Sequence, residues 1–241
     1  NARMHKIDLN VSFSYSEDKT LYADDTSVGQ AGSDLNVLQE LTRTSYKRIE
    51  EWMEANKLHL NKAKTVEMIF SLKQINTDTT EFTKFLGVHI DSTLSWHHQI
   101  DDLCKKLCKN IYLLRNLTRC VSIDVIKIAY FATFQSHVEY SIILWGHTGL
   151  SERVFRLQRR VIRIISNLRY RDDCKEHFKL LNLLTVPCLF IYKCLDYFVK
   201  NRKKFKTLNS YHNYSTRGND ICLRGFRLTR SRLGFNYYCV K

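Results

Sequence analysis

The chain of 241 residues has few of the residues that interrupt helices. It contains one proline and eight glycines. Proline removes a backbone donor and glycine weakens a helix, so their scarcity predicts long helices. The hydrophobic share of 44% and the aromatic share of 12% are typical of an ordered globular protein and exclude an intrinsically disordered one.

Three further patterns are missing from the sequence. Its eight cysteines form no Cys-x-x-Cys pair and no Cys/His cluster with zinc spacing, so we expect free thiols in a reducing compartment and no zinc site. No signal peptide occurs, and no apolar run approaches the ~20 residues that cross a bilayer. We therefore expect an intracellular protein, nuclear or cytoplasmic, that is not secreted and has no membrane partner. The first residue is Asn1 and not Met, and we interpret the chain as a piece of a longer protein.

Excess positive charge is confined to the C-terminal part of the chain. Residues 1–150 hold 17 Lys/Arg and 18 Asp/Glu, whereas residues 151–241 hold 21 Lys/Arg and 6 Asp/Glu, so the second part supplies the whole net charge of +14. Such an excess predicts a polyanionic partner, with nucleic acid first and an anionic membrane surface second. A solvated basic surface without a partner is the alternative.

Two adjacent carboxylates, Asp24 and Asp25, lie between short apolar runs, with Tyr22 just before them. This pattern predicts a β-hairpin, with arms over residues 21–23 and 26–29, that carries both acids at its tip. Neighbouring carboxylates repel each other, so such a tip is either a solvated turn or a cation site. Carboxylates at a strand end supply the hard oxygen ligands that Mg²⁺ prefers.

The remaining periodicities predict an α+β protein with few strands and many helices. Alternating apolar residues predict an extended segment over residues 7–13, and a cap at Ser33 or Asp34 predicts a helix that ends at Asn56 and packs on a sheet. A strand over residues 66–71 and a strand pair over residues 82–90 follow, with a bend at Gly87. Apolar residues at helical spacing then predict helices over residues 100–114, 121–145, 150–168, 174–181 and 187–200.

Several short motifs occur in a fixed order along the chain. They are Ile7-Asp8-Leu9, Tyr22-Ala23-Asp24-Asp25, Ile49-Glu50-Glu51-Trp52, Asn56-Lys57-Leu58, Leu60-Asn61-Lys62-Ala63-Lys64-Thr65, Phe85-Leu86-Gly87-Val88-His89-Ile90-Asp91 with Leu94 and Trp96, Tyr140 to Gly146, Leu157-Gln158-Arg159-Arg160 and Tyr214-Ser215-Thr216-Arg217. In this order and at these intervals, the chain resembles the second half of the reverse transcriptases of non-LTR (LINE-like) retrotransposons, closest to the jockey type. The resemblance covers nearly the whole chain.

The resemblance implies three regions. Residues 1–95 would be a partial polymerase palm, a small antiparallel sheet with a packed helix, a catalytic-type hairpin and a primer-grip-like hairpin. Residues 96–148 would be thumb-like helices, and residues 149–241 a basic helical C-terminal region with a tail. The implied activity is that of an RNA-directed DNA polymerase, a nucleotidyltransferase of a transposable element, whose partners are an RNA template and a DNA primer.

The resemblance also assigns catalytic roles to the acidic hairpin. In the family, two divalent cations, Mg²⁺ or Mn²⁺, lie about 4 Å apart, activate the primer hydroxyl and neutralise charge on the leaving pyrophosphate. Asp24 would be the principal metal ligand and Asp25 the second carboxylate. Tyr22 would pack near the terminal nucleotide of the primer.

Further residues would contact the triphosphate and the primer. Lys64 resembles the catalytic basic residue near the incoming triphosphate, with Lys62 as the competing choice and an ordinary solvated lysine as the other interpretation. Phe85, Leu86 and Gly87 would place backbone against the primer, or else form a plain core hairpin.

Basic helices and the tail would bind the nucleic acid. The first thumb-like helix carries Lys105, Lys106 and Lys109 on one side, and the next basic helix carries Arg156, Arg159, Arg160 and Arg163 at three- and four-residue spacing. Such stripes can follow phosphates, although solvated faces have the same pattern. In the tail, arginines alternate with aromatic rings that can stack on bases, namely Arg217, Arg224, Arg227, Arg230 and Arg232 with Tyr214, Phe226, Phe235 and Tyr237.

The sequence departs from the family in lacking the fingers and the palm strand with the first metal-binding Asp. Asp8 lies too close in sequence to the hairpin to replace it. We therefore expect a reverse-transcriptase fragment whose N-terminal polymerase half is missing and which is inactive alone. The alternative is a non-catalytic RNA- or DNA-binding remnant that acts through its basic C-terminal helices. A membrane-surface protein is the third interpretation, and it is weaker because the arginines lie opposite core-like apolar faces.

Overall fold

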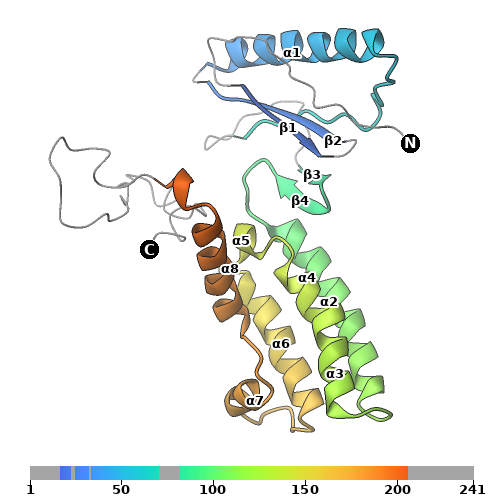
Figure 1. Cartoon of the computed structure of the whole chain (residues 1–241), viewed down its shortest axis with the longest axis vertical. Helices are drawn as coiled ribbons and strands as arrows, with labels where there is room; N and C mark the ends of the chain where they lie inside the picture. The colour runs from blue at the N-terminus through green and yellow to red at the C-terminus, as the bar shows by residue number, and fades with distance from the viewer. Residues whose placement is uncertain (1–16, 23–24, 33, 71–81, 206–241) are drawn as a thin grey trace, which may run out of the picture. The chain divides into compact units, whose positions relative to one another are not determined.

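The computed structural model describes residues 17–22, 25–32, 34–70 and 82–205, and the chain divides into two compact units, residues 1–67 and 68–241. Among these residues the protein is α+β, as predicted, with two separate two-stranded antiparallel sheets and many helices (Figure 1). The predicted extended segment over residues 7–13 and the basic tail lie outside the described residues.

The first unit contains the predicted β-hairpin. Strands β1 (Glu17–Tyr22) and β2 (Asp25–Gln30) pair antiparallel, and Tyr22 is the partner of Asp25 at the turn end of the ladder. Both strands are longer than the sequence predicts. The hairpin itself is confirmed.

One long helix, α1 (Leu35–Ala55), follows the hairpin. It begins after Asp34, whose carboxylate accepts hydrogen bonds from two backbone N–H groups of the first turn, and it ends before Asn56. Nε2 of Gln30 donates to Oγ of Ser45 over 2.7 Å, which ties β2 to α1. The predicted cap, the end of the helix and its packing on a sheet are confirmed.

The predicted strand over residues 66–71 is wrong for residues 66–70, which have no regular secondary structure. Val66 and Phe70 are exposed by 45% and 55%. A β-strand is stable only with a hydrogen-bonded neighbour, and no described strand pairs with this segment. Residue 71 lies outside the described residues.

The second unit consists of a short hairpin and a group of helices. Its elements are β3 (Phe82–Phe85), β4 (Val88–Asp91), α2 (His97–Leu117), α3 (Ile123–Ala129), the π-helical segment η1 (Tyr130–Gln135), α4 (Ser136–Glu139), α5 (Ile142–Trp145), α6 (Ser151–Ile165), α7 (Lys175–Leu180), α8 (Val186–Lys200) and the 3-10 turn η2 (Arg202–Lys204). Helices α2 and α6 lie side by side, and α8 packs against α4, α5 and α6 (Figure 1). The strand pair and most predicted helices are confirmed.

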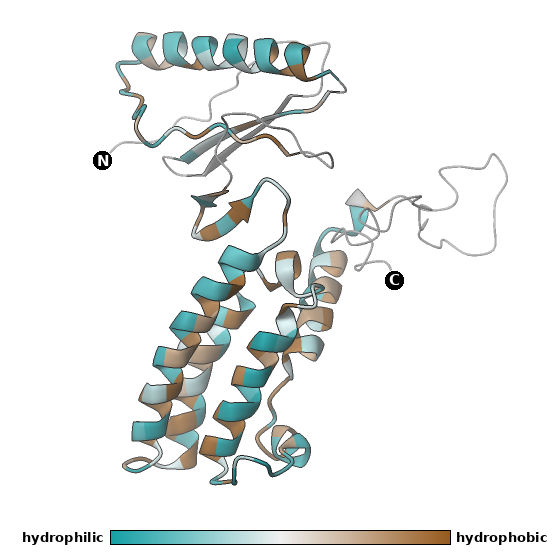
Figure 2. Ribbon diagram, turned by 180° about the vertical axis from the view of Figure 1, so that it is seen from behind, coloured by the Kyte–Doolittle hydropathy of each residue, from teal (hydrophilic) through white to brown (hydrophobic). Residues whose placement is uncertain are grey.

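The core of the second unit lies between these helices. Along α2 the side chains of Ile100, Leu107 and Leu114, spaced seven residues or about two helical turns apart, are fully buried, and Val161 of α6 is buried as well. Figure 2 shows the resulting hydrophobic and hydrophilic stripes along the long helices. The stripes leave the charged residues of α2 and α6 on the outer faces.

The predicted single helix over residues 121–145 is confirmed for residues 123–139, where α3, η1 and α4 follow one another without a gap, and is wrong beyond them, because the chain turns at residues 140–141 before α5. In η1, Oγ1 of Thr133 donates to the carbonyl of Ala129 over 2.6 Å, and side chains that compete for helix carbonyls favour such distortions. After α4 the backbone is extended at Tyr140 and left-handed at Ser141, where φ is 56°. Hydropathy carries no signal for this break, since apolar residues keep helical spacing on both sides of it.

One polar side chain lies within the core. Gln158 of α6 is 1% exposed, and its Nε2 donates to the hydroxyl of Tyr130 and to the carbonyl of Leu184. Its Oε1 accepts from the N–H of Val186, and all three bonds measure 2.9 Å. Burial raises the pKa of Tyr130 to about 12, so its hydroxyl keeps its proton. The amide therefore joins α6 to η1 and to the start of α8.

A buried carboxylate organises the turn between β4 and α2. Asp91 accepts hydrogen bonds from the backbone N–H and hydroxyl groups of Thr93 and Ser95 and from the N–H of Trp96, over 2.7–3.2 Å. Burial alone would raise the pKa of Asp91, but these hydrogen bonds outweigh it and hold the pKa below its usual value. The ionised carboxylate thus fixes where α2 begins.

We expect Asp91→Asn to lower the free energy of unfolding at pH 7 by about 1–3 kcal/mol, because an amide N–H would face hydrogen-bond donors. The pKa of Asp91 is lower in the folded state than in the unfolded chain. The ionised carboxylate therefore adds its full contribution to the free energy of unfolding above about pH 4, and this contribution is lost as the pH falls further. Urea unfolding at pH 7 and pH 3 measures both effects. Asp124→Asn, at an exposed carboxylate in α3, is the control and should change stability by less than about 0.5 kcal/mol. An equal loss for both variants would contradict the prediction.

Candidate nucleic-acid interface

The acidic hairpin is described in part. Asp25 is the first residue of β2, is exposed, and lies opposite Tyr22 in the ladder, whereas Asp24 falls outside the described residues. The exposed carboxylate of Asp25 is chemically suited to a hard cation. Among the residues that the structure describes, no three His, Cys, Asp or Glu side chains gather closely enough to hold a metal ion.

The two lysines after α1 differ in their surroundings. Nζ of Lys62 lies 2.8 Å from Oε1 of Glu50, and the hydrogen bond and charge of Glu50 raise the pKa of Lys62. Lys64 is exposed and makes no ion pair with any described residue. Its ammonium group is therefore open to an external anion, whereas that of Lys62 is held by α1.

The primer-grip-like segment forms the turn between β3 and β4. Phe85 pairs with Val88, and Leu86 and Gly87 between them have φ values of 46° and 81°. Two left-handed residues in succession are typical of a type I′ hairpin turn. The hydroxyl of Tyr140, the residue that follows α4, donates to the carbonyl of Leu86 and holds this turn from the side. The backbone at this turn is thus fixed by a contact that the sequence did not predict.

The three lysines predicted on α2 are not equivalent. Nζ of Lys106 lies 2.8 Å from the carboxylate of Asp102, one helical turn away, so its charge is neutralised locally. Lys105 and Lys109 are exposed, and neither makes an ion pair with a described residue. Two of the three predicted cations are therefore open to a partner.

Helix α6 carries all four predicted arginines on the side opposite its buried residues. Val154, Val161 and Ile165 lie in the core, and the arginine face lies across the helix from them. Arg156 and Arg160 are exposed and have no acidic partner among the described residues. These two guanidinium groups are free to contact an external anion.

The other two arginines of the stripe are held within the protein. Nη2 of Arg159 lies 2.7 Å from a carboxylate oxygen of Glu152, and its guanidinium lies 4.7 Å from the centre of the Phe155 ring. Nε of Arg163 donates to the backbone carbonyl of Asp172 over 2.9 Å. The sequence spacing could not distinguish these arginines from the free pair, since their partners depend on packing.

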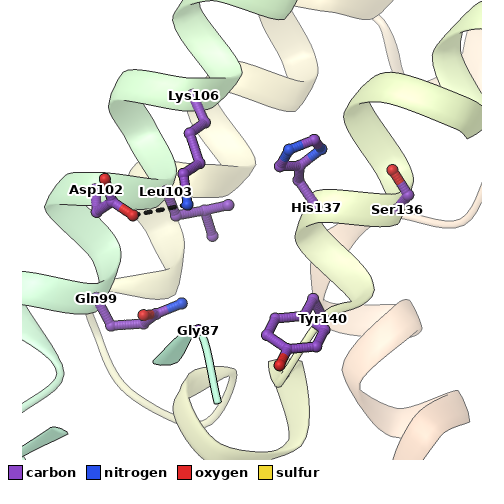
Figure 3. A pocket seen from close by; sticks show the side chains of 8 residues that line it. All are labelled: Gly87, Gln99, Asp102, Leu103, Lys106, Ser136, His137 and Tyr140. Carbon is purple, nitrogen blue, oxygen red and sulfur yellow. Dashed lines mark ion pairs between the residues drawn. The ribbon is translucent and has the colours of Figure 1, made fainter. Parts of the chain in front are cut away.

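A groove of about 250 Å³ lies beside the β3–β4 turn (Figure 3). It is lined by Gly87, by Gln99, Asp102, Leu103 and Lys106 of α2, and by Ser136, His137 and Tyr140 from α4 and the residue after it. Of these residues, only Gly87, Lys106 and Tyr140 belong to the motifs and stripes that the sequence predicts to be functional. Tyr140 enters this lining from the break after α4, which no periodicity signals.

Comparison with known proteins gives no relative. No family model matches the chain, no curated protein matches it, and no solved structure matches it. Within the part of the chain that the structure describes, no helix is long and apolar enough to span a bilayer. The six described cysteines are free thiols.

We expect Gly87→Ala to destabilise the second unit by about 1 kcal/mol, because φ at this position is 81° and a side chain disfavours it. An added Cβ would lie 3.6 Å from the Tyr140 hydroxyl, an ordinary contact, so the cost comes from the backbone. Gly87→Asn should cost less, since asparagine tolerates left-handed φ. Thermal unfolding measures the difference. In the control Gly149→Ala, Cβ meets no atom within 4 Å, and a cost as large as that of Gly87→Ala would refute the explanation.

Proposed function

We propose that this chain is the palm-to-C-terminal portion of a reverse transcriptase of the non-LTR retrotransposon class, and that its basic helices bind RNA or an RNA–DNA duplex. The observation that carries the proposal is the β1–β2 hairpin, in which Tyr22 lies opposite Asp25 and the two intervening residues in sequence are Ala23 and Asp24. The β3–β4 turn at Leu86 and Gly87 supports it, because a fixed turn backbone suits contact with a primer strand.

In this proposal the palm covers residues 1–95, with the β1–β2 hairpin, α1 and the β3–β4 hairpin, and the thumb begins at α2. Asp24 and Asp25 would hold Mg²⁺, which in this class of enzyme activates the primer hydroxyl and neutralises the leaving pyrophosphate. Lys64, with its exposed ammonium group, would bind the incoming triphosphate. Lys105, Lys109, Arg156 and Arg160 are exposed cations without acidic partners among the described residues, and they would contact phosphates.

A non-catalytic nucleic-acid-binding remnant is the second candidate. The charge distribution favours it, since residues 151–241 carry 21 Lys/Arg against 6 Asp/Glu. The two candidates share the same basic surface. They differ in whether the acidic hairpin takes part in catalysis within a longer protein.

We expect the 241-residue chain, purified alone, not to extend a DNA primer on an RNA template with Mg²⁺ and deoxynucleotides. Two carboxylates without the third ligand hold the cations poorly. Gel analysis of a labelled primer measures extension, and Asp24→Ala is the control for metal-dependent chemistry. Robust extension by the chain that disappears in Asp24→Ala would contradict the prediction.

The free arginines of α6 provide a test of nucleic-acid binding. We expect the double variant Arg156→Ala, Arg160→Ala to bind a labelled single-stranded RNA more weakly, because two phosphate contacts are removed. The slope of log affinity against log salt concentration should become shallower by about 1–2. The affinity is measured by fluorescence anisotropy at several salt concentrations from about 50 to about 200 mM, a range over which such slopes are large enough to resolve.

The matched control is Arg159→Ala, Arg163→Ala, which removes the same charge from the same helix. These arginines are held by Glu152 and by the Asp172 carbonyl, so this variant should lose stability and change the salt slope less. Equal changes of slope in both double variants would show that net charge alone governs binding. Salt-independent affinity of the unmodified chain would reject a phosphate-binding surface altogether.

A further inference from the structure

The groove beside the β3–β4 turn has a hydrogen-bond donor fixed in orientation. Gln99 is 6% exposed, and its Oε1 accepts from the backbone N–H of His89 over 2.9 Å. Since the amide oxygen is engaged there, Nε2 is turned the other way, and Figure 3 shows it directed into the groove. The N–H groups of Gln99 are thus presented to whatever enters.

His137 offers the complementary group from the other side. Its Nδ1 lies 2.6 Å from the carbonyl of Thr133, and a carbonyl only accepts, so Nδ1 carries the hydrogen. In the neutral ring, Nε2 is then the acceptor. Figure 3 shows His137 of α4 and Gln99 of α2 on opposite sides of the groove. A ligand with both an acceptor and a donor on its edge matches this pair.

The charges in the groove cancel. The carboxylate of Asp102 lies 2.8 Å from Nζ of Lys106 and 3.7 Å from Nε2 of His89. The hydrogen bond from Lys106 keeps the pKa of Asp102 below its usual value, so the acid is ionised. Because Lys106 is already paired with this carboxylate, the described residues that line the groove include no unpaired cation to attract a phosphate group. The groove therefore favours a neutral, hydrogen-bonding ligand over an anion.

A flat aromatic wall completes the groove. Tyr140 is 53% exposed, and its hydroxyl bond to the Leu86 carbonyl holds the ring in place. Gly87 has no side chain, and an added Cβ there would lie only 3.6–3.9 Å from the Tyr140 ring and hydroxyl. At about 250 Å³ the space is smaller than the roughly 300–1,000 Å³ of pockets for drug-sized ligands. It suits a single flat ring.

We propose that this groove binds one unstacked nucleobase of a single-stranded nucleic acid. Tyr140 provides the stacking face, Nε2 of Gln99 donates to the base edge, and Nε2 of His137 accepts from it. The inference rests on the nucleic-acid binding proposed above and adds a site for a base to a surface that otherwise recognises phosphates. It does not depend on the catalytic role of the acidic hairpin.

The test fills the groove with a side chain. Ser136 is exposed and lines the groove, and its hydroxyl donates only to the Ala132 carbonyl of its own helix, over 2.6 Å. Ser136→Phe places a ring in the groove without changing the charge or the core. Ala132→Phe, at an exposed position one turn earlier and outside the groove, is the matched control.

The probe is a 12-nucleotide single-stranded oligouridylate, compared by fluorescence anisotropy with an oligonucleotide of the same length that carries abasic sites. We expect Ser136→Phe to bind the oligouridylate about 5- to 150-fold more weakly, the range for loss of one base–aromatic stack, with an unchanged salt slope. The variant should also show a smaller difference in affinity between the two probes than the unmodified chain does. Ala132→Phe should behave like the unmodified chain.

Photo-cross-linking provides a readout that needs no variant. A 5-iodouridine oligonucleotide irradiated with the unmodified chain should form an adduct at Tyr140, identified by mass spectrometry. Adducts at other residues alone, or equal affinities of Ser136→Phe and Ala132→Phe, would overturn the groove assignment while salt-dependent binding persisted. Absence of any oligonucleotide binding would overturn both this inference and the proposed nucleic-acid binding.

Discussion

The second unit depends on the buried amide of Gln158. Its three hydrogen bonds reach Tyr130 in η1 and the two backbone groups of Leu184 and Val186 before and within α8. A buried amide without these partners would destabilise the core, so the three segments must keep their relative positions. Because Gln158 points inward, the opposite side of α6, which carries Arg156 and Arg160, must face outward. The orientation of the basic face thus follows from a polar contact in the core.

Ion pairs within the protein then select which charges remain open to a partner. Nη2 of Arg153 lies 2.7 Å from Asp101 and joins α6 to α2, and Lys193 of α8 lies 2.7 Å from Glu139 of α4. Cations held in this way offer less charge to an external polyanion than free ones do. A sequence stripe of basic residues consequently overstates the surface that is open to phosphate groups. Of the four predicted arginines of α6, only Arg156 and Arg160 have guanidinium groups without a partner among the described residues.

The break after α4 has a comparable effect on the polar groove. In an uninterrupted helix over residues 121–145, the backbone of Tyr140 would follow the helical path of the residues before it. The extended residue Tyr140 and left-handed Ser141 instead allow the Tyr140 hydroxyl to reach the Leu86 carbonyl, 54 residues earlier in the sequence. This single contact holds the β3–β4 turn and forms one wall of the groove. A local irregularity therefore brings together a hairpin and two helices.

The sequence by itself determined the features that arise from neighbouring residues. The cap of α1 at Asp34, the β1–β2 hairpin and the start of α8 near Pro187 depend on side chains within a few positions of the backbone groups they affect. Only the tertiary structure decided the features that depend on distant partners. Residues 66–70 lack a strand because no described strand pairs with them, and Arg159 and Arg163 differ from Arg156 and Arg160 because packing gives them partners. Hydrophobic periodicity reports which face of an element is buried, but it does not report which polar groups meet there.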